Sequence, residues 1–167
     1  MKTLVALVAA CALVGGATGA RADPTDAWTA PARVAKAIGP CTQVGDLSMP
    51  SKATSCTTTY TDACENATGS STLSIEMCTE AAVTYWNGVI AQRVHALRAY
   101  HLTAVDAFVQ TSDAAWQRYR SVRCGMYRDF EGTLSGIQAG LCQLETTIQR
   151  ADDLREYGGH VTAKGVD

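Results

Sequence analysis

Apolar side chains recur every three or four positions from about residue 71 to residue 157, and this stretch contains no proline. Such spacing places them on one face of a helix. The pattern predicts three helices, over residues 72–100, 104–128 and 134–157, which can bury their apolar faces only against one another. The predicted core positions are Val83, Trp86, Ile90, Val94, Leu97 and His101, then Val105, Phe108, Val109, Ala115, Trp116, Tyr119, Met126 and Phe130, then Leu134, Ile137, Leu141, Leu144, Ile148, Ala151 and Leu154.

The chain before this region has a different character. Residues 23–63 hold all four prolines and many Thr and Ser side chains, which predicts a largely irregular N-terminal extension. One short helix is expected within it, because Pro31 suits a first helical position and Gly39 a C-terminal cap, with Pro40 preventing continuation.

The first 22 residues are typical of a secretory signal peptide. An early lysine precedes an apolar run and a small-residue site, which predicts cleavage after Ala22, with cleavage after Ala20 as the alternative. Cys11 stands in a context that faintly resembles a lipid-attachment site, but the apolar run before it is short and continues beyond it. No other apolar run approaches the length of about 20 residues that spans a bilayer. We therefore expect an exported protein, periplasmic or secreted.

Six cysteines remain after signal cleavage, and in an oxidising compartment they predict three disulfides rather than a metal site. Antiparallel helices bring four of them to one end of the bundle. Among the 15 connectivities we favour the pairs Cys64–Cys78, Cys124–Cys142 and Cys41–Cys56. The expected fold is all-α: a small antiparallel bundle of about three helices over 64–157, stapled by disulfides, with the irregular extension before it and a flexible tail at 158–167.

Net charge and the motifs present in the sequence exclude several classes of function. Removal of Lys2 and Arg21 leaves 12 basic residues against 16 acidic ones, a balance that argues against nucleic acid and suits a basic partner. The three histidines form no metal-binding pair, no nucleophile elbow is present, and no helical carboxylate is marked as desolvated. We therefore expect a protein that is not an enzyme and that carries no cofactor and no metal.

Three glycines, Gly132, Gly136 and Gly140, are spaced by four residues. They predict either a flexible loop or, if helical, a strip without side chains against which another helix packs closely.

The segment "WQRYRSVRC" places Trp116, Arg120 and Cys124 on one helical face. A guanidinium lies well against an indole one turn away, and its donors can satisfy carbonyl or carboxylate oxygens. We interpret the segment as structural: Trp116 fills the core, Arg120 stacks on it and Cys124 staples the helix end.

This segment, with "CENATGSSTLSIEMC" before it and "CQLETTIQRADDL" after it, resembles the LprI-type lysozyme inhibitor family over residues 64–157. Three features depart from the family pattern: Ser121 replaces an Asp, Asp113 a Gln, and Ile90-Ala91 a Leu-Asn pair. If the Asp that Ser121 replaces normally pairs with an arginine, Arg150 or Arg120 must find another acceptor. The positions that match the motif outside the cysteines are Ala67, Met77, Trp116, Arg120, Thr147, Arg150 and Leu154.

The resemblance implies a small, exported, non-enzymatic helical protein that binds a basic lysozyme and inhibits it by occluding its cleft. A rigid acidic surface would do this, with charge steering speeding the encounter. It also implies that Trp116 and Arg120 belong to the scaffold. The alternative is an interaction or stress module of the cell envelope that does not contact lysozyme.

Overall fold

The computed structural model describes residues 28–43, 50–129 and 132–163, and within these ranges the chain is helical, without strands. None of the described helices is both long enough and apolar enough to cross a membrane. The helices are α2 (Pro31–Gln43), α3 (Pro50–Thr68), α4 (Thr72–Arg98), α5 (Thr103–Gly125), the 3-10 turn η1 (Met126–Asp129) and α6 (Thr133–Ala163).

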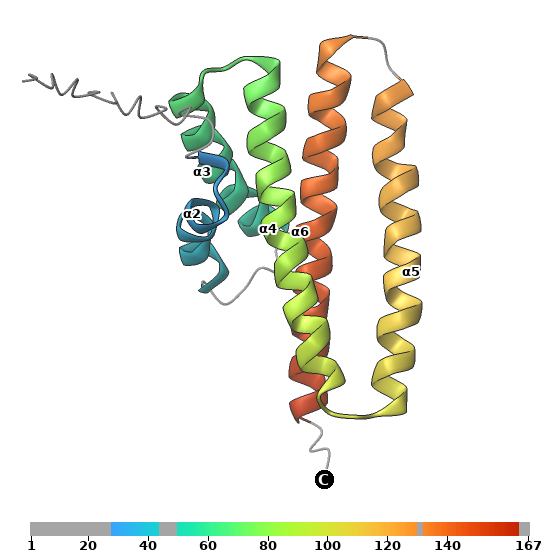
Figure 1. The fold of residues 1–167 in the computed structure, drawn as a ribbon. Helices are drawn as coiled ribbons and strands as arrows, with labels where there is room; N and C mark the ends of the chain where they lie inside the picture. Colours follow the sequence, from blue (N-terminus) through green and yellow to red (C-terminus); the bar gives the residue numbers. More distant parts are fainter. Residues whose placement is uncertain (1–27, 44–49, 130–131, 164–167) are drawn as a thin grey trace, which may run out of the picture.

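Helices α4, α5 and α6 form the antiparallel bundle that the periodicity predicted (Figure 1). Helix α6 lies against both α4 and α5, and its contact with α4 is the most extensive in the molecule. The core between them is built from side chains of the predicted faces, because these positions recur with the helical period. The buried members include Trp86, Ile90, Leu97, Val105, Val109, Leu144, Ile148, Ala151 and Leu154.

The prediction of an irregular extension was wrong for α3, which is helical from residue 50 onward. Its buried face is formed by Thr57, Tyr60, Thr61 and Cys64, at helical spacing. The Thr61 hydroxyl donates to the carbonyl of Thr57 at 3.1 Å, so the polar atom is satisfied within the helix and the methyl group can face the core. A Thr-rich sequence can therefore form a buried helical face, which composition alone did not indicate.

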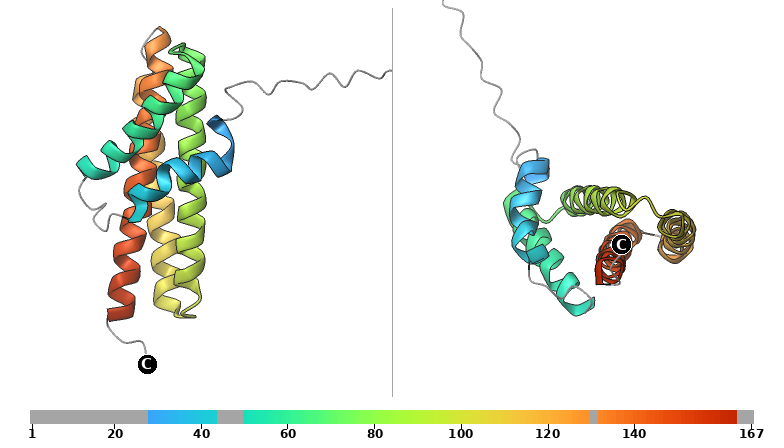
Figure 2. Two further views of the ribbon diagram at one scale, coloured as in Figure 1. Left: turned by 90° about the vertical axis from the view of Figure 1, so that its left-hand side faces the viewer. Right: turned by 90° about the horizontal axis from the view of Figure 1, so that it is seen from below.

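Helix α2 begins at Pro31 as predicted, but Gly39 does not end it and the helix continues beyond Pro40, contrary to expectation. Val34 and Ile38 are fully buried against the bundle. Tertiary packing of this face offsets the loss of one backbone hydrogen bond at the proline. Together α2 and α3 lie across one side of the long helices (Figure 2).

The predicted flexible tail is also partly wrong, because α6 continues to Ala163. Val161 is buried there, and Gly158 lies against the side chain of Leu97. The last turns of α6 are thus held by the lower end of α4.

Six predicted core positions are exposed. Helix α5 lies at the edge of the bundle and buries only Val105, Val109 and Cys124, so much of its predicted apolar face meets solvent. Phe130 lies outside the described residues. The exposed positions are His101, Ala115, Tyr119, Met126, Leu134 and Leu141.

Of the three glycines spaced by four residues, two lie in α6 and one lies in the connection before it. A Cβ atom on Gly136 would lie 2.5 Å from Oε1 of Glu76, and one on Gly140 would lie 3.3 Å from Cγ2 of Thr79. Both glycines are helical. At Gly140 a side chain would require α4 to shift, so this glycine permits the close approach of α6 to α4, whereas the flexible Glu76 side chain could move away from Gly136. Gly132, with φ of +109°, instead belongs to the connection before α6.

Tyr60 fastens α3 to the N-terminal segment. Its hydroxyl donates to the carbonyl of Trp28 at 3.2 Å, and burial raises its pKa to about 12. The folded state therefore favours the neutral phenol, so its contribution to stability is present below pH 10 and is lost as pH rises from about 10 to 12. We expect the unfolding free energy to fall more steeply over this window in the wild type than in Tyr60→Phe, measured by urea unfolding. Parallel curves for the two proteins would contradict the raised pKa.

Candidate functional site

The connection between α3 and α4 lies at the end of the molecule where α6 begins (Figure 1). We call residues 65–76 the α3–α4 tip. A disulfide between Cys64 and Cys78 closes its base, with Cα atoms 6.0 Å apart and both cysteines fully buried. This is one of the pairs favoured from the sequence. The bridge ties the last turn of α3 to the first turns of α4, so the tip is a short closed loop on a rigid base.

Hydrogen bonds within the tip hold its turn in one conformation. The Ser74 amide donates to Oγ of Ser71 at 3.1 Å and caps α4, and the Ser74 hydroxyl donates to the Thr68 carbonyl at 3.3 Å. The Gly69 amide donates to the Glu65 carbonyl at 2.8 Å. Gly69 has φ of +94°, a conformation that glycine adopts without steric cost. The turn is therefore organised before any partner arrives.

The charges near the tip along the chain are all acidic. Between residues 53 and 92 the chain holds four acidic side chains and no basic one. Asp62, Glu76 and Glu80 are exposed, whereas Glu65 is half-buried. Burial, with a smaller effect of the Asp62 carboxylate, raises the pKa of Glu65. The segments α3 and α4 around the tip thus contribute a negative field toward an approaching partner.

An exposed leucine stands on the tip. The side chain of Leu73 is 66% exposed, although it lies in the first turn of α4 directly beside the disulfide base. An exposed apolar side chain on a rigid, hydrogen-bonded turn can be buried by a partner at little cost in conformational entropy. Sequence reasoning missed both Leu73 and the cap. The available signal was Ser71 standing three residues before Ser74, at the start of the apolar periodicity.

The Trp116 segment lies away from the tip, at the contact between α5 and α6. The Arg120 guanidinium carbon lies 4.3 Å from the Trp116 ring centre, as the spacing suggested. Nε1 of Trp116 donates to the Thr146 carbonyl at 3.0 Å, and Arg120 reaches the Thr147 hydroxyl at 3.4 Å. Trp116 is only half-buried, so the expectation that it fills the core was wrong; the fully buried tryptophan is Trp86.

Arg150 is buried and has polar partners on α5. Its side chain is 4% exposed, and Nη2 donates to the Ser112 hydroxyl at 2.9 Å and lies 3.9 Å from Oδ1 of Asp113. Burial lowers the pKa of Arg150, and the Asp113 carboxylate opposes this effect. Asp113, one of the departures from the family pattern, is thus a carboxylate within ion-pair distance of Arg150, whereas Arg120 has no such partner among the described residues.

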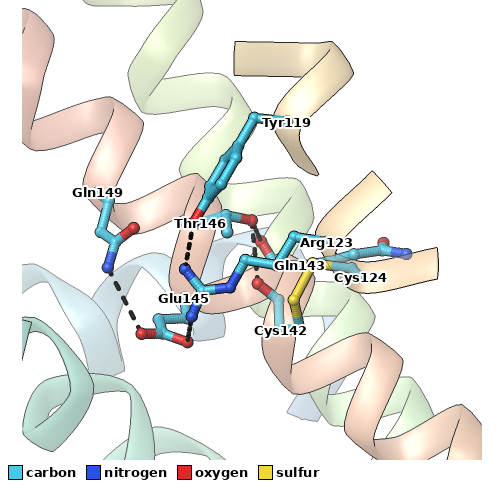
Figure 3. A network of polar contacts seen from close by, with 8 residues as sticks. All are labelled: Tyr119, Arg123, Cys124, Cys142, Gln143, Glu145, Thr146 and Gln149. Atoms are coloured by element: carbon cyan, nitrogen blue, oxygen red, sulfur yellow. Dashed lines mark hydrogen bonds and ion pairs between the residues drawn. A yellow bond between two sulfur atoms is a disulfide. The ribbon is translucent and has the colours of Figure 1, made fainter. Parts of the chain in front are cut away.

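The second disulfide joins the last turn of α5 to α6. It joins Cys124 to Cys142, again a pair favoured from the sequence, with Cα atoms 5.5 Å apart. Beside it, Arg123 donates to the Glu145 carboxylate at 3.2 Å and to the Tyr119 hydroxyl at 2.7 Å (Figure 3). These contacts brace the two helices without placing a reactive group in a cleft.

The remaining motif positions do not converge on one site. Ala67 is exposed on the tip, Leu154 is buried in the core, and Thr147 is buried on α6. Met77 lines a groove of about 570 Å³ between α2 and α4. The side chains of the predicted pair Cys41–Cys56 lie outside the described part of the structure, so that pairing stays a prediction.

Comparison with known proteins returns one family. The family described as "Lysozyme inhibitor LprI" matches residues 64–154, more than half of the chain. No curated protein and no solved structure gives a significant match. The matched range begins at the first cysteine of the tip and ends at Leu154, so it includes the tip, both described disulfides and most of the bundle.

Proposed function

Because this chain belongs to the LprI lysozyme inhibitor family, we propose that it binds lysozyme and inhibits it by inserting the α3–α4 tip into the cleft of the enzyme. The observation that carries the proposal is the family match over the segment that forms the tip and its disulfide base. The family is named for inhibition, which agrees with a protein that is not itself an enzyme. The same proposal places the mature protein outside the cytoplasm, where disulfides persist.

The shape of the tip suits the occlusion of a cleft. A turn that is closed by a disulfide and fixed by its own hydrogen bonds loses little conformational entropy when it binds. Leu73 would supply the apolar contact at the centre of the interface. The rigid bundle behind the tip prevents it from collapsing when it enters the cleft.

The charges around the tip suit a cationic enzyme. Glu65 and Glu76 flank the turn, and no basic side chain occurs between residues 53 and 92. Complementary charge speeds the encounter of two proteins more than it strengthens the final complex. We therefore expect the association rate with a cationic lysozyme to fall as salt is added.

Inhibition of a c-type lysozyme by the purified, oxidised mature protein tests the proposal. In a turbidity assay on bacterial cell walls, stoichiometric protein is expected to stop lysis. Leu73→Ala should weaken inhibition about tenfold, a typical loss for a central interface contact. Leu134→Ala is the matched control, because Leu134 is 67% exposed but lies outside the tip. Glu76→Lys should slow association at low salt, whereas Glu156→Lys, on an exposed position of α6, should not.

Normal lysis at every salt concentration would contradict the proposal and favour an envelope module with another partner. Equal losses in Leu73→Ala and Leu134→Ala would show that the tip is not the contact surface.

A further inference from the structure

A small polar pocket of about 340 Å³ lies where α5 ends, between α5, η1 and α6. Its polar lining consists of two guanidinium groups, one hydroxyl and two carboxamides, and none of its lining residues carries a carboxylate. These groups belong to Gln117, Arg120, Ser121, Arg128 and Gln143. Two positive charges in a concave site without an acid raise the local concentration of anions.

The pocket is held in shape independently of any ligand. Arg120 is fixed from one side by its stacking on Trp116 and by its contact with the Thr147 hydroxyl. The Cys124–Cys142 disulfide joins the two helices at the pocket wall, next to Gln143. A binding site built on bridged helices keeps its donors in place, which lowers the entropy cost of binding.

The arginines of the pocket have no carboxylate partner in the described ranges, unlike Arg123 and Arg150. Arg123 is paired with Glu145 (Figure 3), and Arg150 has Asp113 nearby. Within the part of the chain that the structure describes, neither Arg120 nor Arg128 forms an ion pair, and both line the pocket. The pocket thus brings together two guanidinium groups that have no carboxylate partner among the described residues.

We propose that this pocket binds a phosphoryl anion, either free phosphate or a phosphate monoester. Guanidinium groups present planar, forked donors that match phosphate oxygens, and charge-assisted bonds of this kind are about twice as strong as neutral ones. Ser121 and the two carboxamides supply further donors for a tetrahedral anion. The volume admits the anion with a short ester group. This site is separate from the α3–α4 tip and does not depend on lysozyme binding.

Isothermal titration calorimetry of the oxidised mature protein with sodium phosphate, at constant ionic strength in chloride, tests the site. We expect saturable 1:1 binding in the wild type. Arg128→Gln should weaken it about tenfold, because an exposed guanidinium donor is lost without disturbing the fold. Ser121→Asp should abolish binding by placing a carboxylate in the pocket, whereas Ser121→Asn should retain most of it.

Arg118→Gln is the matched control, since Arg118 is exposed on α5, makes the same change in net charge and does not line the pocket. Competition by glycerol phosphate would assign the site to phosphate esters, and its absence would assign it to the free ion. Absence of phosphate binding in the wild type overturns the proposal. Equal losses in Arg118→Gln and Arg128→Gln, or equally strong binding of acetate, would also overturn it.

Discussion

Replacing Trp86 with alanine is expected to lower the free energy of unfolding by about 3–5 kcal/mol. The side chain is 0% exposed and is among the largest fully buried in the protein. It lies on α4, whose contact with α6 is the most extensive in the fold, and it meets the ring of Tyr85 edge-on. Removal of the indole leaves a cavity that helices held by two disulfides can only partly fill. Urea unfolding followed by circular dichroism measures the loss.

Two further variants separate packing from hydrogen bonding. Trp116→Ala should cost less than Trp86→Ala, because Trp116 is half-buried and the loss of its bond to the Thr146 carbonyl can be compensated by water. Trp86→Phe should cost much less than Trp86→Ala, since Nε1 of Trp86 has no hydrogen-bond partner among the described residues. A larger loss in Trp116→Ala than in Trp86→Ala would contradict this account of the core.

The double substitution Cys64→Ser/Cys78→Ser is expected to weaken lysozyme inhibition about a hundredfold. The bridge closes a 14-residue separation around the α3–α4 tip, and without it the tip must be ordered when it binds. By the chain-entropy argument, a bridge of this size stabilises a fold by about 3 kcal/mol, which is close to a hundredfold change in an equilibrium constant. Inhibition titrations on the turbidity assay give the change in the inhibition constant.

The matched control is Cys124→Ser/Cys142→Ser, which removes a bridge of similar separation, 18 residues, that joins α5 to α6 and does not close the tip. It should lower stability by a similar amount, leave inhibition largely intact, and weaken phosphate binding instead. A reducing agent should impair both activities. If the two double variants lost inhibition equally, general destabilisation and not the tip would explain the effect.

Two features that the sequence could not assign depended on distant contacts. Arg150 finds Asp113 and Ser112 on another helix, 37 and 38 positions away, and only the packing of α5 on α6 brings them together. Trp86 and Trp116 have the same helical spacing pattern, yet one is enclosed by the bundle and the other stands at its edge. Periodicity identifies a face, but the number of neighbours around that face decides how deeply it is buried.

What the sequence by itself determined about this protein is local: the three long helices, most of the faces they bury and the gathering of four cysteines at one end. These follow from spacing, because a 3.6-residue period and short connections leave few arrangements. Only the tertiary structure decided that the Thr-rich segment is the helix α3, that α5 is an edge helix and that α3 and α4 form a stapled acidic tip. Those outcomes depend on which surfaces meet, and the free energy of that burial overrides weak local propensities.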